Sequence, residues 1–491
     1  MLYHSTRRDN TNFTGSQAIL TGLAPDGGLF VPSSIPKIDY TKLLNTDYYT
    51  LGAEILSLYL PEFSNNELNS FFKKAYSIDK FRDDILRLTN TGKNEYTLEL
   101  WHGPTAAFKD FALVLLPYIV QESKKLNDIK TDTVILVATS GDTGKAALEG
   151  YKDIEGIEIA VFYPDNGTSE IQRLQMCTQE GNNVKVFALN GNFDDVQTSI
   201  KQAFLSSELK DHLSKRNKVL SSANSINWGR LLPQIVYYFY AYITLVNRNN
   251  ITLGDTIDFC VPSGNFGDIL AGYYAKEMGL PIGTLICASN ANNILTDFLQ
   301  TGVYNTNREF YKTISPSMDI LVSSNLERLL YSFTQDSTMV EAYYKSLAES
   351  KSFSIPAEYL HDIQKTFFAG YANDIAVLDM IKQKYTKENY LCDPHTATAY
   401  CVLEQYKKKN GSSKPCVVLS TASPYKFSPD VLKALGNKVP ENEFESIKIL
   451  EEFTGTHAPD SITSLHNKPV RFSTVVEPSN IIQTIKEIFS V

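Results

Sequence analysis

The 491-residue sequence has no excess of basic residues: 46 Lys and Arg stand against 55 Asp and Glu, giving a net charge of −9. No basic block stands out, which argues against nucleic acid or an anionic membrane as a partner. Long hydrophobic runs are also lacking. The longest apolar stretch, 231–246, contains four tyrosines and is shorter than the about 20 residues that cross a bilayer. Because the first fifteen residues also lack the apolar core of a secretory signal, we expect a soluble, cytoplasmic protein.

Cysteine and histidine are sparse and show no metal-binding spacing. The six cysteines include no C-x-x-C pair, and the seven histidines form no H-E-x-x-H motif. Most of the cysteines lie in apolar stretches, such as Cys260 and Cys416, so we interpret them as small buried residues in a reducing compartment. The sequence therefore predicts neither a structural nor a catalytic metal.

The length exceeds what one hydrophobic core usually holds, so several domains are expected. Short β-branched runs alternate with helical patterns from about residue 96 onward, which favours an α/β architecture with parallel sheets. The first hundred residues are instead expected to form a small, mainly helical region, and the stretch 300–390 to be predominantly helical. We expect the N-terminal region to cover 1–95, a smaller α/β domain 96–228 and a larger one 229–491.

Lys109 is the first residue with possible chemistry. Pro104 and Thr105 are expected to start a helix in which Lys109 lies on an apolar face. Burial there would lower the pKa of the amine and make it a nucleophile. The alternative, favoured by periodicity alone, is that Lys109 pairs with Asp110 or extends its charged end to solvent.

Two glycine loops share the pattern S-G-x-x-G between an expected strand and an expected helix. The first is TSGDTG at 139–144 and the second is PSGNFGD at 262–268. Glycines allow tight turns, and free amides at a helix start can hold an anion. One such loop is common in α/β proteins, but two with the same pattern point more strongly to phosphate binding. Neither matches the nucleotide-binding motifs G-x-x-x-x-G-K-[ST] or G-x-G-x-x-G, which disfavours ATP and NAD.

Ser420 and Thr421 close a strand expected in the sheet interior, where α/β folds place ligand contacts. A hydroxyl there could face a ring nitrogen. The alternative is a helix cap or a turn before Ser428 and Pro429.

Together these segments resemble the threonine synthase family, of the longer type found in yeast and many bacteria. HGPTAAFKD resembles the family's lysine motif, ATSGDTG its first glycine loop, PSGNFGD its cofactor-phosphate loop and LSTA its strand-end segment. Stretches without obvious chemistry also match: LAPDGGLFVP, NSINWGRLLPQ, FLQTGVY, SPSMDI and DPHTA. The resemblance runs from about residue 3 to residue 436.

The resemblance implies two open, twisted α/β domains of the fold type II, tryptophan synthase β kind, with pyridoxal 5'-phosphate between them. Lys109 would carry this cofactor as a Schiff base and take up the substrate's α-proton, and Thr421 would meet the pyridine nitrogen. Lys145 and the sequence Ala422-Ser423-Pro424 depart from the usual family pattern. The implied cofactor-phosphate ligands are Gly264, Asn265, Phe266 and Gly267, and the implied contacts of the substrate's amino-acid end are Ser140, Gly141, Asp142 and Thr143.

The family's reaction converts O-phospho-L-homoserine and water into L-threonine and phosphate, and the enzyme is a carbon–oxygen lyase. Asn227, Arg230 and Lys145 are candidates to bind the departing phosphate; a structural ion pair is the alternative for Arg230. A phospholyase that releases 2-oxobutanoate would use the same residues, so the sequence separates it poorly from threonine synthase. A third possibility, a catalytically idle relative, would be expected to lack the motif residues that are present here. Whether the protein is a monomer or a homodimer stays open.

Overall fold

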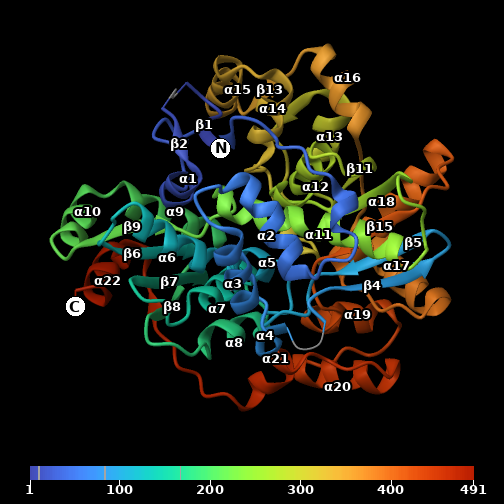
Figure 1. Cartoon of the computed structure of the whole chain (residues 1–491). Helices are drawn as coiled ribbons and strands as arrows, with labels where there is room; N and C mark the ends of the chain where they lie inside the picture. The colour runs from blue at the N-terminus through green and yellow to red at the C-terminus, as the bar shows by residue number, and fades with distance from the viewer. Residues whose placement is uncertain (9–10, 82–83, 166, 491) are drawn as a thin grey trace.

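The computed structural model describes residues 1–8, 11–81, 84–165 and 167–490, and its centre is a six-stranded sheet in the order β14-β11-β10-β15-β5-β4 (Figure 1). Neighbouring strands are parallel except β4, which pairs antiparallel with β5 at one edge. Its central strands are buried along their whole length, as the near-continuous apolar runs of a parallel sheet require. The strands are β4 (Arg87–Gly92), β5 (Glu95–Glu99), β10 (Ile257–Pro262), β11 (Ile282–Ser289), β14 (Phe367–Tyr371) and β15 (Cys416–Ser420).

A second, five-stranded sheet has the order β16-β8-β7-β6-β9 and is parallel throughout. Helices α7, α8, α9 and α10 alternate with its strands along the chain, so both sheets confirm the predicted α/β architecture. The strands are β6 (Asp132–Ala138), β7 (Ile157–Pro164), β8 (Val184–Leu189), β9 (Lys218–Ser222) and β16 (Val475–Val476), and the helices are α7 (Asp142–Tyr151), α8 (Glu170–Cys177), α9 (Phe193–Leu205) and α10 (Ser207–Ser214).

The N-terminal region is mainly helical, as predicted, but it also contains a small antiparallel sheet in the order β2-β1-β3 that the sequence analysis missed. These strands are only two to four residues long, too short for a periodic pattern to show. Thr14 and Ser64 each form a capping box that fixes the start of a helix. The elements are β1 (Leu2–Ser5), β2 (Phe13–Thr14), α1 (Gly15–Thr21), β3 (Phe30–Pro32), η1 (Tyr40–Leu43), α2 (Tyr48–Tyr59), α3 (Asn65–Ala75) and α4 (Ile78–Phe81).

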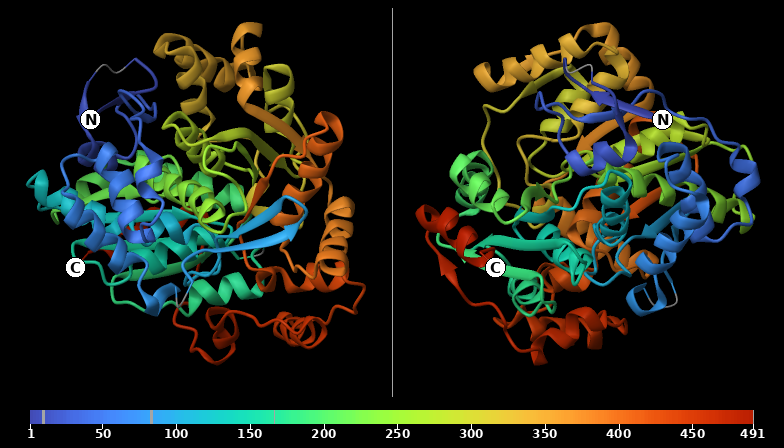
Figure 2. Two further views of the ribbon diagram at one scale, coloured as in Figure 1. Left: turned by 45° about the vertical axis from the view of Figure 1, so that its right-hand side comes forward. Right: turned by 60° about the vertical axis from the view of Figure 1, so that its left-hand side comes forward.

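The sheets do not follow the expected domain limits at two places. Strand β5 lies, apart from its first residue, in 96–228, the range expected for the smaller domain, yet it hydrogen-bonds to β15 in the larger sheet. The C-terminal segment, from α20 (Glu443–Thr454) to α22 (Ile481–Ile488), returns from the larger sheet to the smaller one, where β16 pairs with β8 (Figure 2). Both pairings join segments about 300 residues apart, and such long-range contacts leave no local signal in the sequence.

The long apolar stretch forms α11 (Trp228–Asn247), a helix buried along most of its length, where it packs against α2, α5 (Asp110–Leu113) and α12 (Gly267–Glu277). Among the described residues, no helix is long and apolar enough to cross a membrane. The cytoplasmic location and the absence of a nucleic-acid partner stay predictions. All six cysteines are free and buried, which confirms their expected role as small core residues.

The remaining elements surround the larger sheet and connect it to the C-terminus. The stretch 300–390 is predominantly helical, as predicted, apart from β12, β13 and β14. In chain order these elements are α12 (Gly267–Glu277), α13 (Ile294–Thr301), β12 (Val303–Asn305), η2 (Pro316–Met318), α14 (Leu326–Thr334), α15 (Ser337–Ser350), β13 (Ser352–Ser354), α16 (Ala357–Thr366), α17 (Asp374–Glu388), α18 (Pro394–Asn410), η3 (Pro424–Phe427), α19 (Ser428–Ala434), α20 (Glu443–Thr454), α21 (Asp460–Thr463), η4 (Ser464–Asn467), η5 (Pro478–Asn480) and α22 (Ile481–Ile488).

Candidate active site

The segment that carries Lys109 is not helical from Pro104 onward, and that prediction was wrong. Ala106 has a φ of +56°, which no right-handed helix contains, and helix α5 (Asp110–Leu113) begins only after Lys109. The residues before Lys109 are held by the chain that follows β15, an inner strand of the larger sheet. The Phe108 amide donates to the Thr421 carbonyl at 2.8 Å, and Ala107 forms an isolated bridge with Ala422. Lys109 therefore lies at the start of a helix, where its side chain reaches across to the smaller sheet. Helix α6 (Leu116–Leu126) follows.

The Lys109 side chain is 13% exposed, and its amine faces two polar partners. Its Nζ lies 3.3 Å from the Ser317 hydroxyl and 3.8 Å from Asp142 Oδ2. Burial lowers the pKa of Lys109 to about 8; Asp142 opposes this effect, and the charges of Lys426 and Arg230 add to it. At this pKa roughly a tenth of the amine is neutral, and nucleophilic, at pH 7, far more than for an ordinary lysine.

Asp110 is not the partner of Lys109, which removes one of the alternatives left open by the sequence. Its carboxylate instead accepts hydrogen bonds from the Thr105 amide and the Thr105 hydroxyl, at 2.9 and 2.7 Å. Asp110 thereby ties the turn before α5 to the first turn of that helix. Burial raises the pKa of Asp110 to about 7.

The first glycine loop places the carboxylate of Asp142 opposite Lys109. Gly141 has a φ of +153°, and a Cβ there would lie 2.5 Å from the Gln172 side chain, so glycine is required. Asp142 opens α7 and accepts hydrogen bonds from Lys426 Nζ at 2.6 Å and from Gln172 Nε2 at 2.9 Å. The lysine charges hold the pKa of this carboxyl well below its usual range despite its burial. Contact of Ser140, Gly141, Asp142 and Thr143 with a substrate stays a prediction.

Lys426 belongs to this cluster and was missed by the sequence analysis. Its side chain is fully buried, and Nζ donates to the Asp142 carboxylate and, at 3.1 Å, to the Thr105 carbonyl. The available signal was a lysine in the apolar segment that directly follows the strand-end hydroxyls. Such a position buries a charge, and a buried charge needs a partner.

The second glycine loop leads from β10 into α12 and leaves backbone donors open. Phe266 takes the left-handed conformation, with a φ of 61°, and no side chain caps the helix that starts at Gly267. The first amides of α12 therefore point out of the helix end without a capping acceptor, which suits an anion. The Asn265 side chain turns away to Ser324, whose hydroxyl lies 3.1 Å from it. Gly264 packs so tightly that a Cβ would lie 2.8 Å from the Ser317 carbonyl oxygen.

Thr421 lies at the carboxyl end of β15, beside the Lys109 segment. Its carbonyl accepts from the Phe108 amide, whereas its hydroxyl has no hydrogen-bond partner among the residues that the structure describes. The preceding Ser420 is occupied: its oxygen accepts from Trp101 Nε1 at 3.1 Å. Of the two strand-end hydroxyls, the one on Thr421 is thus available to a ligand.

The three candidates for a departing phosphate differ in what they contact. Arg230 is buried, donates one hydrogen bond to the Ala223 carbonyl at 2.8 Å, and has an Nε without a partner in the described part of the chain. Burial lowers its pKa to about 10, and no carboxylate in the described part of the chain pairs with it. The Asn227 side-chain amide donates to the Ile19 carbonyl, and its side-chain carbonyl accepts from the Gly229 amide. Lys145 pairs with Glu149 at 3.2 Å and also contacts Gln179, so of the two candidate cations Arg230 is the one whose charge is not already paired.

Comparison with known proteins agrees with this geometry. Three family models match the chain: Threonine synthase N terminus over residues 2–76, Pyridoxal-phosphate dependent enzyme over 85–422, and Threonine synthase, C-terminal over 396–488. Threonine synthase from Saccharomyces cerevisiae is 36% identical over 88% of this chain and 89% of its own. The chain belongs to the threonine synthase family. The C-terminal match extends the resemblance beyond residue 436, where the sequence motifs ended.

Two further relatives are a solved structure and a longer human protein. PLP-bound threonine synthase from Brucella melitensis shares the fold with a TM-score of 0.88 and 35% identity, over 100% of this chain and 98% of its own. The human protein Threonine synthase-like 1 is 38% identical over 86% of this chain, and the matched region covers 58% of the human protein. The chain thus spans less than two thirds of the length of that relative.

The residues of this threonine synthase family member fit pyridoxal phosphate. The uncapped end of α12 offers amides to a phosphate, and the free hydroxyl of Thr421 offers a donor or acceptor to a ring nitrogen. Lys109 supplies an amine whose pKa is already lowered for covalent attachment. Among the described residues, no group of three or more His, Cys, Asp or Glu side chains could hold a metal ion.

Proposed function

We propose that this chain converts O-phospho-L-homoserine and water into L-threonine and phosphate, with pyridoxal phosphate as cofactor. The observation that carries the proposal is the buried excess of positive charge: the charges of Lys426 and Arg230 both act on Lys109, and Asp142 pairs with the two lysines but not with Arg230. Arg230 has a buried Nε without a partner among the described residues, which is costly unless an anion binds. A substrate and a cofactor that each bear a phosphate supply such anions.

The chain's own residues have distinct tasks in this reaction. When bound, the cofactor withdraws electrons from the bonds at the substrate's α-carbon. Lys109 would anchor the cofactor, and its amine, when free and neutral, would accept the substrate's α-proton, which its lowered pKa permits. Ser317 and Asp142 hold Nζ at 3.3 and 3.8 Å. Thr421 offers a neutral hydroxyl to the pyridine nitrogen, and Arg230 binds the substrate's phosphate.

Product analysis tests the proposal directly. The purified protein, loaded with pyridoxal phosphate and supplied with O-phospho-L-homoserine, is expected to release L-threonine and phosphate in equal amounts. Release of phosphate with 2-oxobutanoate in place of threonine would reassign the chain to the phospholyase reaction. Release of neither product from a yellow, folded protein would contradict both.

Two buried arginines provide a matched test of the phosphate site. Burial lowers the pKa of both Arg230 and Arg328 to about 10, but Arg328 donates to Phe30 O, Asn325 Oδ1 and Ile226 O within the fold. We expect Arg230→Gln to raise KM for the substrate about tenfold or more, because a charge-assisted hydrogen bond contributes about 1.5–3 kcal/mol. Arg328→Gln is expected to lower the melting temperature with a smaller change in KM. An unchanged KM in Arg230→Gln removes Arg230 from the phosphate site.

A further inference from the structure

Ser317, in η2, contacts Lys109 and both glycine loops. Its hydroxyl lies 3.3 Å from Lys109 Nζ and 3.4 Å from Asp142 Oδ2. Its carbonyl lies where a Cβ on Gly264, in the second glycine loop, would approach it to 2.8 Å. The position of Ser317 therefore affects the spacing between Lys109, the first loop and the second loop.

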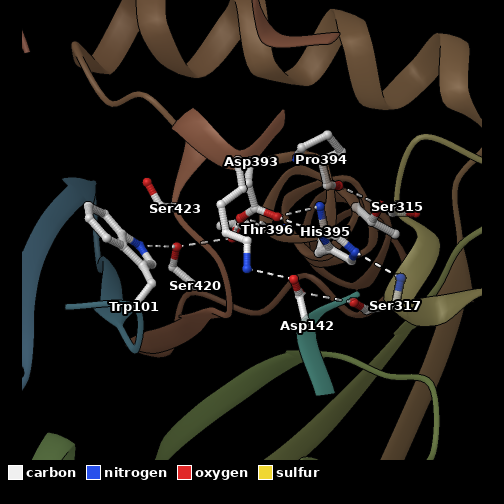
Figure 3. A network of polar contacts seen from close by, with 12 residues as sticks. Trp101, Asp142, Ser315, Ser317, Asp393, Pro394, His395, Thr396, Ser420 and Ser423 are labelled. Atoms are coloured by element: carbon white, nitrogen blue, oxygen red, sulfur yellow. Dashed lines mark hydrogen bonds and ion pairs between the residues drawn. The ribbon is translucent and has the colours of Figure 1, made fainter. Parts of the chain in front are cut away.

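The backbone of Ser317 is held by a buried histidine on α18. The Ser317 amide donates to His395 Nε2 at 3.2 Å, and His395 Nδ1 lies 2.7 Å from Asp393 Oδ1 (Figure 3). A peptide N–H can only donate, so Nε2 must be unprotonated, and the proton of the neutral ring lies on Nδ1, which donates to Asp393. His395 is 2% exposed and Asp393 0%, so this tautomer is fixed away from water.

The other oxygen of Asp393 reaches the opposite side of the site. Asp393 Oδ2 accepts from the Thr396 hydroxyl, whose oxygen lies 3.0 Å from the Ser420 hydroxyl. Trp101 Nε1 donates to the same Ser420 oxygen at 3.1 Å. The Thr396 hydroxyl thus lies between the Asp393 carboxylate and the Ser420 oxygen, within hydrogen-bond distance of both. Ser420 directly precedes Thr421.

We propose that Asp393 and His395 are positioning residues, and that the single carboxylate of Asp393 fixes two opposite sides of the cofactor site. Through His395 it sets Ser317, which holds the amine of Lys109. Through Thr396 it sets Ser420, and with it the strand end that presents Thr421. The positioning role itself follows from the contacts; only its importance for catalysis rests on the proposed function.

Helix capping alone does not account for these contacts. Asp393 is the N-cap of α18 and accepts from the amides of His395 and Thr396, at 2.9 and 3.4 Å. A cap requires neither a histidine at the second helical position nor the bond from its ring to Ser317. Asp336 caps α15 in the same way, with its carboxylate on the Thr338 and Met339 amides, and contacts no histidine ring.

Two substitutions at His395 separate its two bonds. In His395→Gln the side-chain carbonyl can replace Nε2 as acceptor for the Ser317 amide, whereas His395→Asn keeps a donor to Asp393 but is too short to reach Ser317. In the cofactor-free protein, we expect amide hydrogen exchange within 313–319 to be about five- to tenfold faster in His395→Asn than in wild type, and near wild type in His395→Gln. We also expect His395→Asn to bind pyridoxal phosphate more weakly and to have a lower kcat than wild type, whereas His395→Gln stays near wild type in both. KM should change little in either variant.

Equal exchange in wild type and His395→Asn would overturn the proposal, as would equal effects of both variants on exchange and cofactor affinity. If the His395 variants fail to fold, Asp393→Asn decides, because asparagine caps a helix as well as aspartate does. Asp393→Asn is expected to weaken cofactor binding about tenfold while Asp336→Asn leaves it unchanged; equal affinities in the two variants contradict the positioning role. Exchange and cofactor binding are measured without turnover, so absence of threonine formation would count against the proposed function and not against this one.

Discussion

The first glycine loop, 139–144, and the second, 262–268, both join a parallel strand to a helix through S-G-x-x-G. In the first, Thr139 Oγ1 accepts from the amides of Gly141 and Gly144 at 3.0 and 2.9 Å. The second has Pro262 at the position of Thr139, and α12 starts without a side-chain cap. The residue before the shared pattern thus determines whether the loop's own side chain or a ligand satisfies the amides.

The two loops consequently present different groups to the site around Lys109. The first presents a side chain, the carboxylate of Asp142, which pairs with Lys426 and lies 3.8 Å from Lys109. The second presents backbone amides and a close-packed Gly264. A shared glycine pattern therefore predicts a tight strand-to-helix turn, but not the chemistry that the turn offers.

The largest effect is expected from replacing Lys109, which lies at the centre of the site. Lys109→Ala deletes the amine that we propose as the cofactor anchor, so we expect the visible absorbance of the bound cofactor and threonine formation both to disappear. Lys124→Ala is the matched control: Lys124 is also largely buried, and its Nζ donates to the Gly156 carbonyl away from the site. A Lys109→Ala protein with full turnover would refute the assignment of Lys109.

Asp142→Asn tests whether the first loop acts through its carboxylate. Buried Lys426 then loses its charged partner, and we expect the free energy of unfolding to fall by about 3–5 kcal/mol. Because the folded-state pKa of Asp142 lies below the unfolded value near about 4, this stabilisation is present above that pH and is lost as the pH falls. Denaturation at several pH values measures it.

The same variant should also shift the pH dependence of cofactor attachment. Lys109 reacts as the neutral amine, so in wild type the attachment rate should rise with pH, with a midpoint near the pKa of about 8. Asp142 raises that pKa, so its removal should move the midpoint to lower pH. A midpoint that stays in place or moves upward means that Asp142 does not act on Lys109.

Gly264→Ala tests whether the second loop acts through close backbone packing. The added Cβ would lie 2.8 Å from the Ser317 carbonyl and must displace it, so we expect cofactor affinity to fall about tenfold, or about 1.4 kcal/mol. Gly144→Ala in the first loop places a Cβ 2.4 Å from Thr139 Cγ2. Its main effect should be a lower melting temperature, and an affinity loss as large as that in Gly264→Ala would remove the distinction between the loops.

Thr139→Val should have the smallest effect on activity. Valine keeps the shape but removes the acceptor for two buried amides, at a cost of about 1–3 kcal/mol in stability. Cofactor affinity should hardly change, because these amides face Thr139 and not the cofactor. Thr133→Val, on the same strand, is the control, since the Thr133 hydroxyl makes no hydrogen bond among the described residues. A large loss of affinity in Thr139→Val would show that the first loop also binds through its backbone.

The sequence predicted the parts of the site that depend on local pattern. The β-branched runs predicted the strands, and the glycines at strand ends predicted both loops. Lys109 was singled out by its resemblance to the family's lysine motif, since periodicity alone favoured a structural lysine. The helix expected from Pro104 was wrong because the bonds from Ala107 and Phe108 to residues 421–422 outweigh a local helix signal. Local propensity contributes at most about 1 kcal/mol per ordinary residue, so such tertiary contacts override it readily.

The partners of Lys109 could not be predicted, because they lie far from it in the sequence. Ser317 lies 208 residues from it and His395 another 78 residues further on, in segments that matched the family without any visible chemistry. Lys426 likewise meets Asp142 over 284 residues. A side chain's hydrogen-bonding capacity can be derived from its type, but its partner is decided only when the sheets bring distant strand ends together.

The sequence by itself determined the α/β architecture, the family and the two glycine turns, and it proposed Lys109 as the anchor, because each rests on residues close together in the chain. Only the tertiary structure decided that Asp142 pairs with Lys426, that Arg230 keeps a free donor and that Asp393 reaches both sides of the site. The physical reason is burial: a charge or a polar group removed from water must find a partner, and the fold determines which one lies within reach.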